Sequence, residues 1–173
     1  MRPSLLFFTL FLVLASCSTR SEAAKTNSDD KVIAGWVEEV CFPGIEQAIK
    51  AKLDTGAKTS SIYAENIQRF EKNNERWVRF NLALKDKNQK VHKLKLEKPL
   101  SRRVKIKNHD GNHDSRVTVN IPMSFNGQTE EVEFSLVDRS EYIYPVLLGR
   151  RFLSQYVLVD ASSTFLTSSS CGK

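Results

Sequence analysis

The chain has 173 residues, of which 40% are hydrophobic, and this supports a single domain with a substantial core. Its 26 basic and 20 acidic residues give a net charge of +6, which favours solubility and also attracts anionic partners such as an acidic peptide or lipid headgroups. No motif of interleaved aromatic and basic residues accompanies this charge, so we expect no nucleic-acid partner.

The N-terminal residues have the form of a bacterial export signal. Arg2 is the only charge before an apolar run over residues 5–15, and that run is too short to span a bilayer. The sequence Leu14-Ala15-Ser16-Cys17 resembles a lipoprotein lipobox, which implies cleavage before Cys17 and a lipid on its sulfur. The alternative is an ordinary secretory signal that is cleaved near Ala23 or Ala24.

The resemblance to a lipobox implies both a division of the chain and a location. Residues 1–16 are then a signal peptide, and residues 17–30 hold the lipidated Cys17 and a flexible polar tether. Ser18 after the cysteine resembles signals that sort to the outer membrane. We expect a protein of the bacterial cell envelope, anchored through the lipid on Cys17 at the periplasmic face of the outer membrane.

Strand signals dominate residues 31–167, the expected folded domain. Segments rich in Val, Ile and aromatic residues alternate with polar residues and end at Gly, Pro, Asn or Asp. Only residues 150–156 have a helical pattern, and residues 168–173 are expected to form a frayed, Ser-rich tail. Many short strands indicate an all-β sandwich or a partly closed barrel. The expected strands cover residues 32–42, 45–53, 59–63, 77–84, 91–96, 104–106, 117–125, 129–137 and 157–159.

Two cysteines remain if Cys17 carries a lipid. An exported compartment can oxidise Cys41 and Cys171 to a disulfide that ties the end of the first strand to the C-terminus. The alternative is two free thiols, because the sequence does not show whether the two Cα atoms lie within bridging distance.

Asp54-Thr55-Gly56 is the stretch with the most chemical content. It follows the apolar segment Ala51-Lys52-Leu53 and places a carboxylate at a tight turn. Far downstream, Val146-Leu147-Leu148-Gly149-Arg150 is a second apolar segment that ends in glycine. Each segment alone is a weak signal, but the two in this order in one small chain are more specific.

These segments resemble the retropepsin-like aspartic peptidases. The closer resemblance is to a bacterial branch often called ATP-dependent zinc proteases, associated with RimK/LysX-type ATP-grasp ligases. That branch shares Gly35-Trp36-Val37-Glu38, the basic hairpin region from Arg102 to Arg116, and Asp138-Arg139. The resemblance covers nearly all of residues 31–166 and implies a closed acid-protease barrel with one short helix after Leu-Leu-Gly-Arg.

The resemblance also implies roles for the residues of both segments. Asp54 is the catalytic residue, Thr55 orients its carboxylate through a side-chain hydrogen bond, and Gly56 lets the backbone and the substrate approach closely. Leu147, Leu148 and Gly149 pack behind this loop. Arg150 either supports the site through an ion pair or lies free on the surface.

Peptide hydrolysis by this class uses a water held between two carboxylates that share one proton. One chain supplies one such Asp, so the resemblance implies a homodimer that shares two copies of Asp54. Asp160 is the nearest second candidate, but no glycine follows it, and we expect it to have a structural role.

A hairpin over residues 102–119, tipped by Asp110-Gly111, is the candidate flap that covers a substrate; a surface hairpin without substrate contact is the alternative. Basic side chains on its stems, together with Lys58 and Thr59, are expected to bind substrate and to clamp carboxylates. The link of the branch to ligases that append glutamate suggests glutamate-rich peptides as substrates. The basic stem residues are Arg102, Arg103, Lys105 and Arg116.

We expect no metal and no cofactor. His109 and His113, with Asp110 and Asp114, have ligand types at close spacing, but they lie in a turn that does not present them on one helix face. The sequence contains no Gly-x-x-x-x-Gly-Lys-Ser/Thr loop that would bind ATP.

The sequence therefore predicts an aspartic endopeptidase. The alternative is a catalytically inactive envelope lipoprotein on the same fold that binds a peptide or a partner. Lys58 favours this alternative, because a cation beside the two carboxylates would oppose the sharing of a proton.

Overall fold

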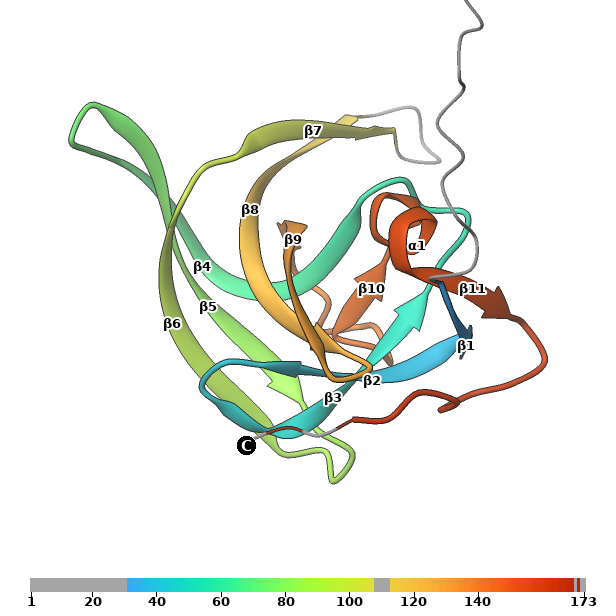
Figure 1. Ribbon diagram of the computed structural model, residues 1–173. Coiled ribbons are helices and arrows are strands. Elements are labelled where there is room, and N and C mark those ends of the chain that lie inside the picture. The colour runs from blue at the N-terminus through green and yellow to red at the C-terminus, as the bar shows by residue number, and fades with distance from the viewer. Residues whose placement is uncertain (1–30, 108–112, 170, 172–173) are drawn as a thin grey trace, which may run out of the picture.

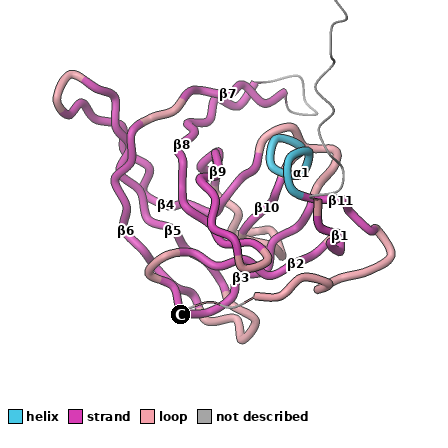
Figure 2. The backbone as a smooth tube through the Cα atoms, viewed as in Figure 1, coloured by secondary structure: helices cyan, strands magenta, loops and turns pink. Residues whose placement is uncertain are grey.

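A computed structural model describes residues 31–107, 113–169 and 171 (Figure 1). The expected signal peptide, the lipid site Cys17 and the tether lie outside these residues. Strands make up most of the described chain, as the coloured tube in Figure 2 shows. The elements are β1 (Val32–Gly35), β2 (Val37–Phe42), β3 (Ile45–Leu53), β4 (Ser60–Lys72), β5 (Glu75–Lys85), β6 (Val91–Pro99), β7 (Arg102–Lys107), β8 (His113–Phe125), β9 (Gln128–Val137), β10 (Val146–Leu148), α1 (Arg150–Tyr156) and β11 (Val157–Asp160).

Six of these strands close into a barrel. Their order around the ring is β10, β3, β2, β8, β9 and β4, and β4 pairs again with β10 (Figure 1). β10 runs parallel to β3, and β4 runs parallel to β9, whereas the other neighbours in the ring are antiparallel. The predicted all-β closed barrel with one short helix after Leu-Leu-Gly-Arg is confirmed.

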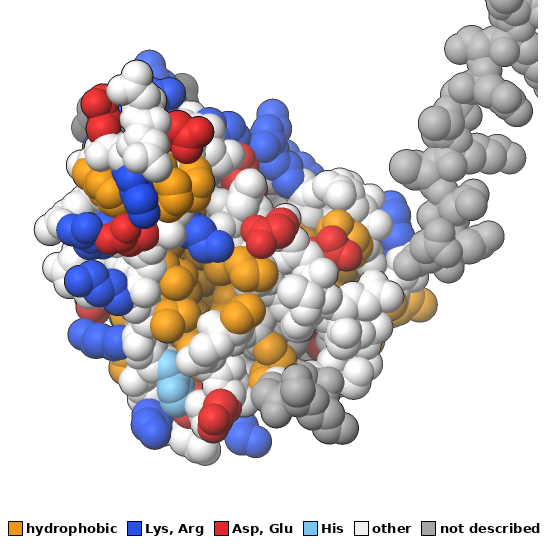
Figure 3. Space-filling view, turned by 60° about the vertical axis from the view of Figure 1, so that its left-hand side comes forward, with side chains coloured by type: hydrophobic (Ala, Val, Ile, Leu, Met, Phe, Trp, Pro, Cys, Tyr) orange, Lys and Arg blue, Asp and Glu red, His pale blue; other side chains and the backbone are white. Residues whose placement is uncertain are grey.

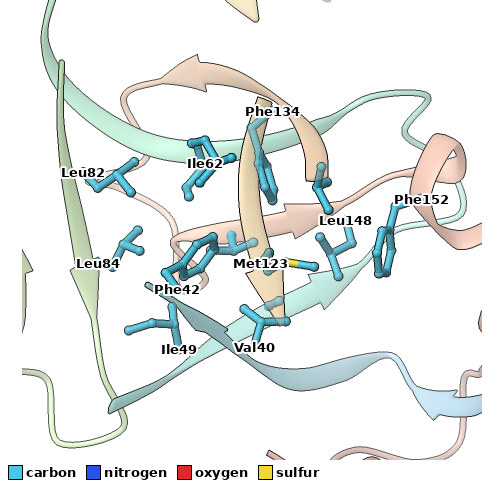
Figure 4. Close-up of a cluster of buried hydrophobic side chains, with 14 of the residues drawn as sticks. Val40, Phe42, Ile49, Ile62, Leu82, Leu84, Met123, Phe134, Leu148 and Phe152 are labelled. Atoms are coloured by element: carbon cyan, nitrogen blue, oxygen red, sulfur yellow. The ribbon is translucent and has the colours of Figure 1, made fainter. Parts of the chain in front are cut away.

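Alternating side chains fill the interior, as the two-residue period of a strand requires. Phe80 and Leu82 of β5, Met123 of β8 and Phe134 of β9 are all fully buried. Figure 4 shows side chains from several strands meeting Phe152 of α1 in the same cluster. Because burying one such side chain stabilises the fold by about 1.5–3 kcal/mol, the core firmly positions the strand ends at its rim.

The strand β4 is longer than the sequence predicted. It was expected to end at residue 63, but it continues to Lys72 and pairs with β5 in a hairpin that extends away from the barrel (Figure 1). Residues 66–69 of this extension are all exposed, so no apolar alternation marks them in the sequence. Phe70 pairs with Trp77 across the hairpin, and Lys72 lies over the Trp77 ring at 4.6 Å.

The strand β6 lies at the edge of the sheet next to β5. Its residues alternate between exposed and half-buried, with Leu94 and Leu96 packing toward the core and Lys93 and Lys95 facing out. Figure 3 turns this side toward the viewer, and a central group of apolar side chains there has lysine and arginine side chains mainly on its left, with acidic and uncharged side chains on its other sides. Charged side chains of this kind protect an edge strand against pairing with another chain.

The segment that leads into the expected Ser-rich tail is held against the barrel. Glu38 is completely buried, and its carboxylate accepts hydrogen bonds from the backbone N–H groups of Gly35 (2.6 Å), Leu166 (2.9 Å) and Thr167 (3.1 Å). Of the two alternatives for the cysteines, the structure has the disulfide: Cys41 is bonded to Cys171, with the Cα atoms 5.4 Å apart.

Two further strands join the ends of the domain. β1 and β11 form a separate two-stranded parallel sheet in which Ile33 lies opposite Leu158. In the described part of the chain, no helix is long and apolar enough to cross a membrane.

Candidate active site

The Asp54 loop begins where β3 leaves the core. Leu53 is buried and pairs with Leu148 of β10, and the N–H of Asp54 donates to the Leu148 carbonyl oxygen at 2.8 Å. The chain then turns and enters β4 at Ser60. The apolar strand therefore ends at the carboxylate, which is brought to the rim of the barrel.

Backbone amides hold the Asp54 carboxylate. Its Oδ1 accepts a hydrogen bond from the N–H of Gly56 at 2.9 Å and another from the N–H of Ala57 at 3.3 Å. Within the described residues the Thr55 hydroxyl makes no hydrogen bond to this carboxylate, so the orienting role of Thr55 stays a prediction for the dimer. A Cβ atom on Gly56 would lie 3.1 Å from Oδ1, and its absence lets the carboxylate lean over the turn.

The cation beside the carboxylate is Lys52, where the sequence suggested Lys58. Lys52 Nζ lies 3.4 Å from Asp54 Oδ2, and both side chains are partly exposed. Lys52 and Asp54 are two residues apart at the end of β3, so their side chains leave the strand on the same face. Lys58 is exposed at the edge of the same cleft, and its backbone carbonyl accepts a hydrogen bond from Arg151.

The Leu-Leu-Gly-Arg segment packs against the Asp54 loop. A Cβ on Gly149 would come within 2.8 Å of the Thr59 backbone, so only glycine permits this approach. The N–H of Gly149 donates to Ser60 Oγ at 3.1 Å.

Arg150 extends the same support. Its Nη1 donates to the backbone carbonyls of Thr55 and Gly56, each at 2.8 Å. This side chain therefore supports the loop directly, through hydrogen bonds to backbone carbonyls, and an ion pair of Arg150 stays a prediction.

A cleft of about 1050 Å³ opens in front of the carboxylate. Seven cationic side chains line it against two acidic ones, Asp54 and Glu141, so the cleft is strongly electropositive. Of the predicted site residues, the lining includes Asp54, Lys58, Thr59, Arg102, Arg103, Arg116 and Leu147, whereas Thr55, Gly56, Leu148, Gly149 and Arg150 lie behind it.

Two of the predicted substrate-binding arginines are already paired within the chain. Arg102 binds Glu133, with Nη2 2.6 Å from Oε1, and also donates to Thr59 Oγ1 at 3.3 Å. Arg116 Nε lies 2.6 Å from Asp114 Oδ2. Burial raises the pKa of Glu133, but the hydrogen bond and charge of Arg102 outweigh it, so the carboxyl pKa is lower than usual.

The residues that form one wall of the cleft were not among those predicted for the site. It is the loop between β9 and β10, which contributes Arg139, Tyr142 and Ile143. Tyr142 and Ile143 are largely exposed, whereas Arg139 is only 7% exposed. The sequence marks Asp138-Arg139 as a pair shared with the bacterial branch, just before the Leu-Leu-Gly-Arg segment. It does not show that Arg139 is buried.

The described residues form neither a metal site nor a second catalytic site at Asp160. Among them, no group of three or more His, Cys, Asp or Glu side chains is placed to hold a metal ion. His109 and Asp110 lie outside the described residues, as does the side chain of His113. Asp160 accepts hydrogen bonds from Ser162 and Ser163 in its own turn, which is a structural role.

The chain is similar to proteins of one family. A model of the RimB-like family, described as "Retropepsin-like aspartic endopeptidase RimB", matches residues 33–170. Two curated proteins named "Probable alpha-L-glutamate ligase" match over 139 residues each. The one from Shewanella pealeana is 38% identical over 80% of this chain and 30% of its own length, and the one from Desulfotalea psychrophila is 35% identical over 75% of this chain and 28% of its own length.

A solved structure supports the same fold. The crystal structure of a Legionella pneumophila protein of unknown function is 29% identical, with a TM-score of 0.66, and the match covers 79% of this chain and 98% of that chain. The chain spans less than a third of the length of the curated ligases that it matches. On its sequence match and its barrel, it belongs to the RimB-like family of retropepsin-like aspartic endopeptidases.

Proposed function

We propose that the protein is an aspartic endopeptidase that acts as a homodimer and shares two copies of Asp54. The observation that carries this proposal is the Asp54 loop: two backbone amides fix the carboxylate, and its face opens into a cleft large enough for a peptide. A carboxylate with a fixed position is what general acid–base chemistry on a bound peptide requires.

In this mechanism, two Asp54 carboxylates hold one water between them. Like charges about 3 Å apart do not both ionise, so one carboxylate acts as the base and the other as the acid. The base takes a proton from the water as it attacks the peptide carbonyl, and the acid protonates the departing nitrogen. A single chain is incomplete for this step, because the described residues contain only one Asp-Thr-Gly loop.

The charge of the cleft supports an acidic, glutamate-rich peptide as the substrate. Lys58, Arg103 and Lys105 are exposed in the lining and attract negative charge over a distance of about 8–10 Å at ordinary salt. The matched curated proteins are named glutamate ligases, which supports the same class of substrate.

The test is cleavage of matched peptides that contain either Glu or Gln, at pH values from about 4 to about 8. We expect cleavage by the purified chain that is lost in Asp54→Asn and retained in Asp160→Asn, the matched control. Cleavage that is unaffected by Asp54→Asn, or that is abolished by a chelator, contradicts the proposal.

The alternative is a peptide-binding protein without turnover, and one observation favours it. Lys52 Nζ contacts Asp54 Oδ2 at 3.4 Å, so a shared water must displace this ammonium group before it reaches both carboxylates. If this alternative holds, the wild-type chain binds the acidic peptide and leaves it intact at every pH.

We further propose a lipid anchor on Cys17 and a location in the cell envelope, at the periplasmic face of the outer membrane. The Cys41–Cys171 disulfide supports an oxidising compartment outside the cytosol. Labelling of growing cells with radioactive palmitate tests the anchor: the wild-type chain should be labelled and the Cys17→Ser variant should not.

A further inference from the structure

Arg139 differs from the other cations that line the cleft. Only 7% of the residue is exposed, yet within the described residues it has no acidic partner. Lys52, Arg102 and Arg116, in contrast, each pair with a carboxylate. A buried charge without a counter-ion is costly, so its retention needs a reason.

The guanidinium of Arg139 is held in one orientation. Its Nε donates to the Tyr144 carbonyl oxygen at 3.0 Å, and its Nη1 donates to Ser61 Oγ at 3.0 Å. The Tyr142 ring lies 4.4 Å from its central carbon, which adds a cation–π contact. The hydroxyl, the carbonyl and the ring are neutral, so these contacts orient the positive charge without neutralising it.

The remaining nitrogen of Arg139, Nη2, has no hydrogen-bond partner within the described residues. It is not sealed in the core, because Trp77 Nε1 is the only fully buried and unsatisfied side-chain atom of the described part of the chain. Arg139 lines the cleft together with Asp54. Burial lowers the pKa of Arg139 and Arg116 acts in the same direction, whereas Tyr142 and Asp54 oppose them.

We propose that Arg139 is a specificity residue that binds one carboxylate of the substrate inside the cleft, beside the bond that faces Asp54. The inference rests on the proposed function for the place where the peptide lies. Arginine suits this role because its planar group presents parallel N–H donors to a carboxylate, and because it stays protonated when buried. The exposed cations of the cleft then attract the peptide, and Arg139 selects it.

The carboxylate has two possible sources in a peptide: an acidic side chain, or the chain end. Three short peptides distinguish them. The first has one central Glu and blocked ends, the second has Gln in its place and blocked ends, and the third has the Gln with a free C-terminal carboxylate.

Binding is measured by fluorescence anisotropy of labelled peptides with the full chain in an Asp54→Asn background, so that no turnover is needed. We expect the Glu peptide to bind about ten- to a hundredfold more tightly than the Gln peptide, as a charge-assisted hydrogen bond predicts. In Arg139→Gln this ratio should fall to near one while the affinity for the Gln peptide is kept. Arg139→Lys should restore part of the ratio.

A matched control separates the buried cation from the exposed ones. Arg103 lines the same cleft but is exposed and has no acidic partner within the described residues. The effect of Arg103→Gln on peptide affinity should disappear at a salt concentration near 1 M, where the screening length is about 3 Å, whereas the effect of Arg139→Gln should persist.

Clear results overturn the inference. If Arg139→Gln weakens the Glu and Gln peptides by the same factor, Arg139 only supports the loop. An unchanged ratio of the Glu and Gln affinities in Arg139→Gln also refutes it, as does a parent protein that shows no preference for the Glu peptide. There is one exception: if the peptide with the free C-terminus binds tightly and this binding depends on Arg139, the ligand is the carboxylate of the chain end. If Arg139→Gln does not fold, the ratio of the Glu and Gln affinities is measured in Arg139→Lys instead, where it should be lower than in the parent protein.

The proposed function and this inference fail in different ways. A wild-type chain that cuts no peptide but shows the Arg139-dependent preference refutes only the peptidase. A chain that cuts the Glu and Gln peptides equally well, with or without Arg139, refutes only the inference.

Discussion

Two glycines at the Asp54 loop leave room for different neighbours. Gly56 lies under the Asp54 carboxylate in an exposed turn, and a Cβ there would lie 3.1 Å from an oxygen of the side chain. Gly149 lies in the buried contact between two chain segments, where a Cβ would meet backbone atoms of Thr59 at 2.8 and 2.9 Å. A side chain can rotate away from a new methyl group. The Thr59 backbone has less freedom, because the carbonyls of Ala57 and Lys58 just before it accept hydrogen bonds from the N–H groups of Arg150 and Arg151.

Gly149→Ala should therefore destabilise the whole domain. We expect its free energy of unfolding to fall by about 1–3 kcal/mol, because the added methyl group forces β10 and the start of β4 apart. Urea unfolding followed by fluorescence measures this loss. An unchanged midpoint would show that the loop can retreat from Gly149 at little cost.

Gly56→Ala should instead reduce activity. The methyl group displaces the carboxylate from the two amides that hold it, and we expect the cleavage rate to fall at least tenfold with a change in unfolding free energy within about 0.5 kcal/mol. Steady-state kinetics and urea unfolding on the same preparation separate the two effects. Equal activity in this variant and the wild-type chain would show that the Asp54 orientation is not limiting.

The family resemblance predicted one long-range contact of the site, whereas residue patterns alone missed a local contact and a second long-range one. The closeness of the Asp54 loop to the Leu-Leu-Gly segment follows from the family resemblance, and the structure has it. The pairing of Lys52 with Asp54 was not predicted, although a strand places residues two positions apart on the same face. The contact between Arg139 and Ser61 joins residues 78 positions apart, and no local pattern encodes it.

At the scale of elements, one ion-pair cluster joins three of them. Glu133 of β9 binds Arg102 of β7 and Arg151 of α1, whose Nη1 lies 3.1 Å from Oε1. Ser101, just before β7, donates to the same carboxylate at 3.1 Å. This cluster fixes the base of the hairpin that was predicted as a flap.

The Glu133 cluster should make stability depend on acid pH. Folding lowers the pKa of the Glu133 carboxyl. As the pH falls through the ordinary value of 4.5, the unfolded chain therefore binds a proton at this group before the folded chain does. Stability contributed by Glu133 is therefore present above that value and is lost as the pH falls toward the folded-state pKa. Glu133→Gln should flatten the decline in unfolding free energy below pH 4.5, measured by urea titration at each pH.

The matched control for that titration is Glu46→Gln. Glu46 is exposed on β3 and has no ion pair or side-chain hydrogen bond within the described residues. Its replacement should leave the acid limb of the stability curve unchanged. A steep acid limb that survives Glu133→Gln would assign the dependence to another carboxyl, such as Asp86, whose pKa is lowered by its hydrogen bond to His92.

Sequence predicts an element well where one face of it is buried. The bounds of β3 and α1 match the expected residues, because apolar residues recur there at the period of a half-buried element. The far half of β4 has no buried face, so cross-strand pairing with β5 alone makes it a strand. The fixed C-terminal segment depends on Glu38, a buried acid 128 residues away from Leu166, and serine-rich composition gives no sign of that contact.

At the scale of the whole molecule, the proposed mechanism requires two chains. We expect specific activity to fall on dilution, as a homodimer dissociates into inactive single chains. Mixing equal amounts of wild-type chain and Asp54→Asn should leave about a quarter of the dimers with two intact Asp54 residues. Activity should then be about a quarter of that of wild-type chain at the same total protein concentration, measured after exchange of subunits.

A linear response in the mixing experiment would contradict the shared site. If activity tracks the amount of wild-type chain at every ratio and at every dilution, one Asp54 is sufficient for catalysis. Sedimentation measured at the assay concentration gives the oligomeric state independently of activity.

The disulfide gives the described domain an unusual covalent connectivity. Cys41 and Cys171 are 130 residues apart, so nearly the whole barrel lies within one covalent ring. A single protease cut within that ring, for example at the exposed β4–β5 hairpin, does not separate the molecule into two pieces. Such nicked protein would migrate as one species on a denaturing gel until a reductant divides it.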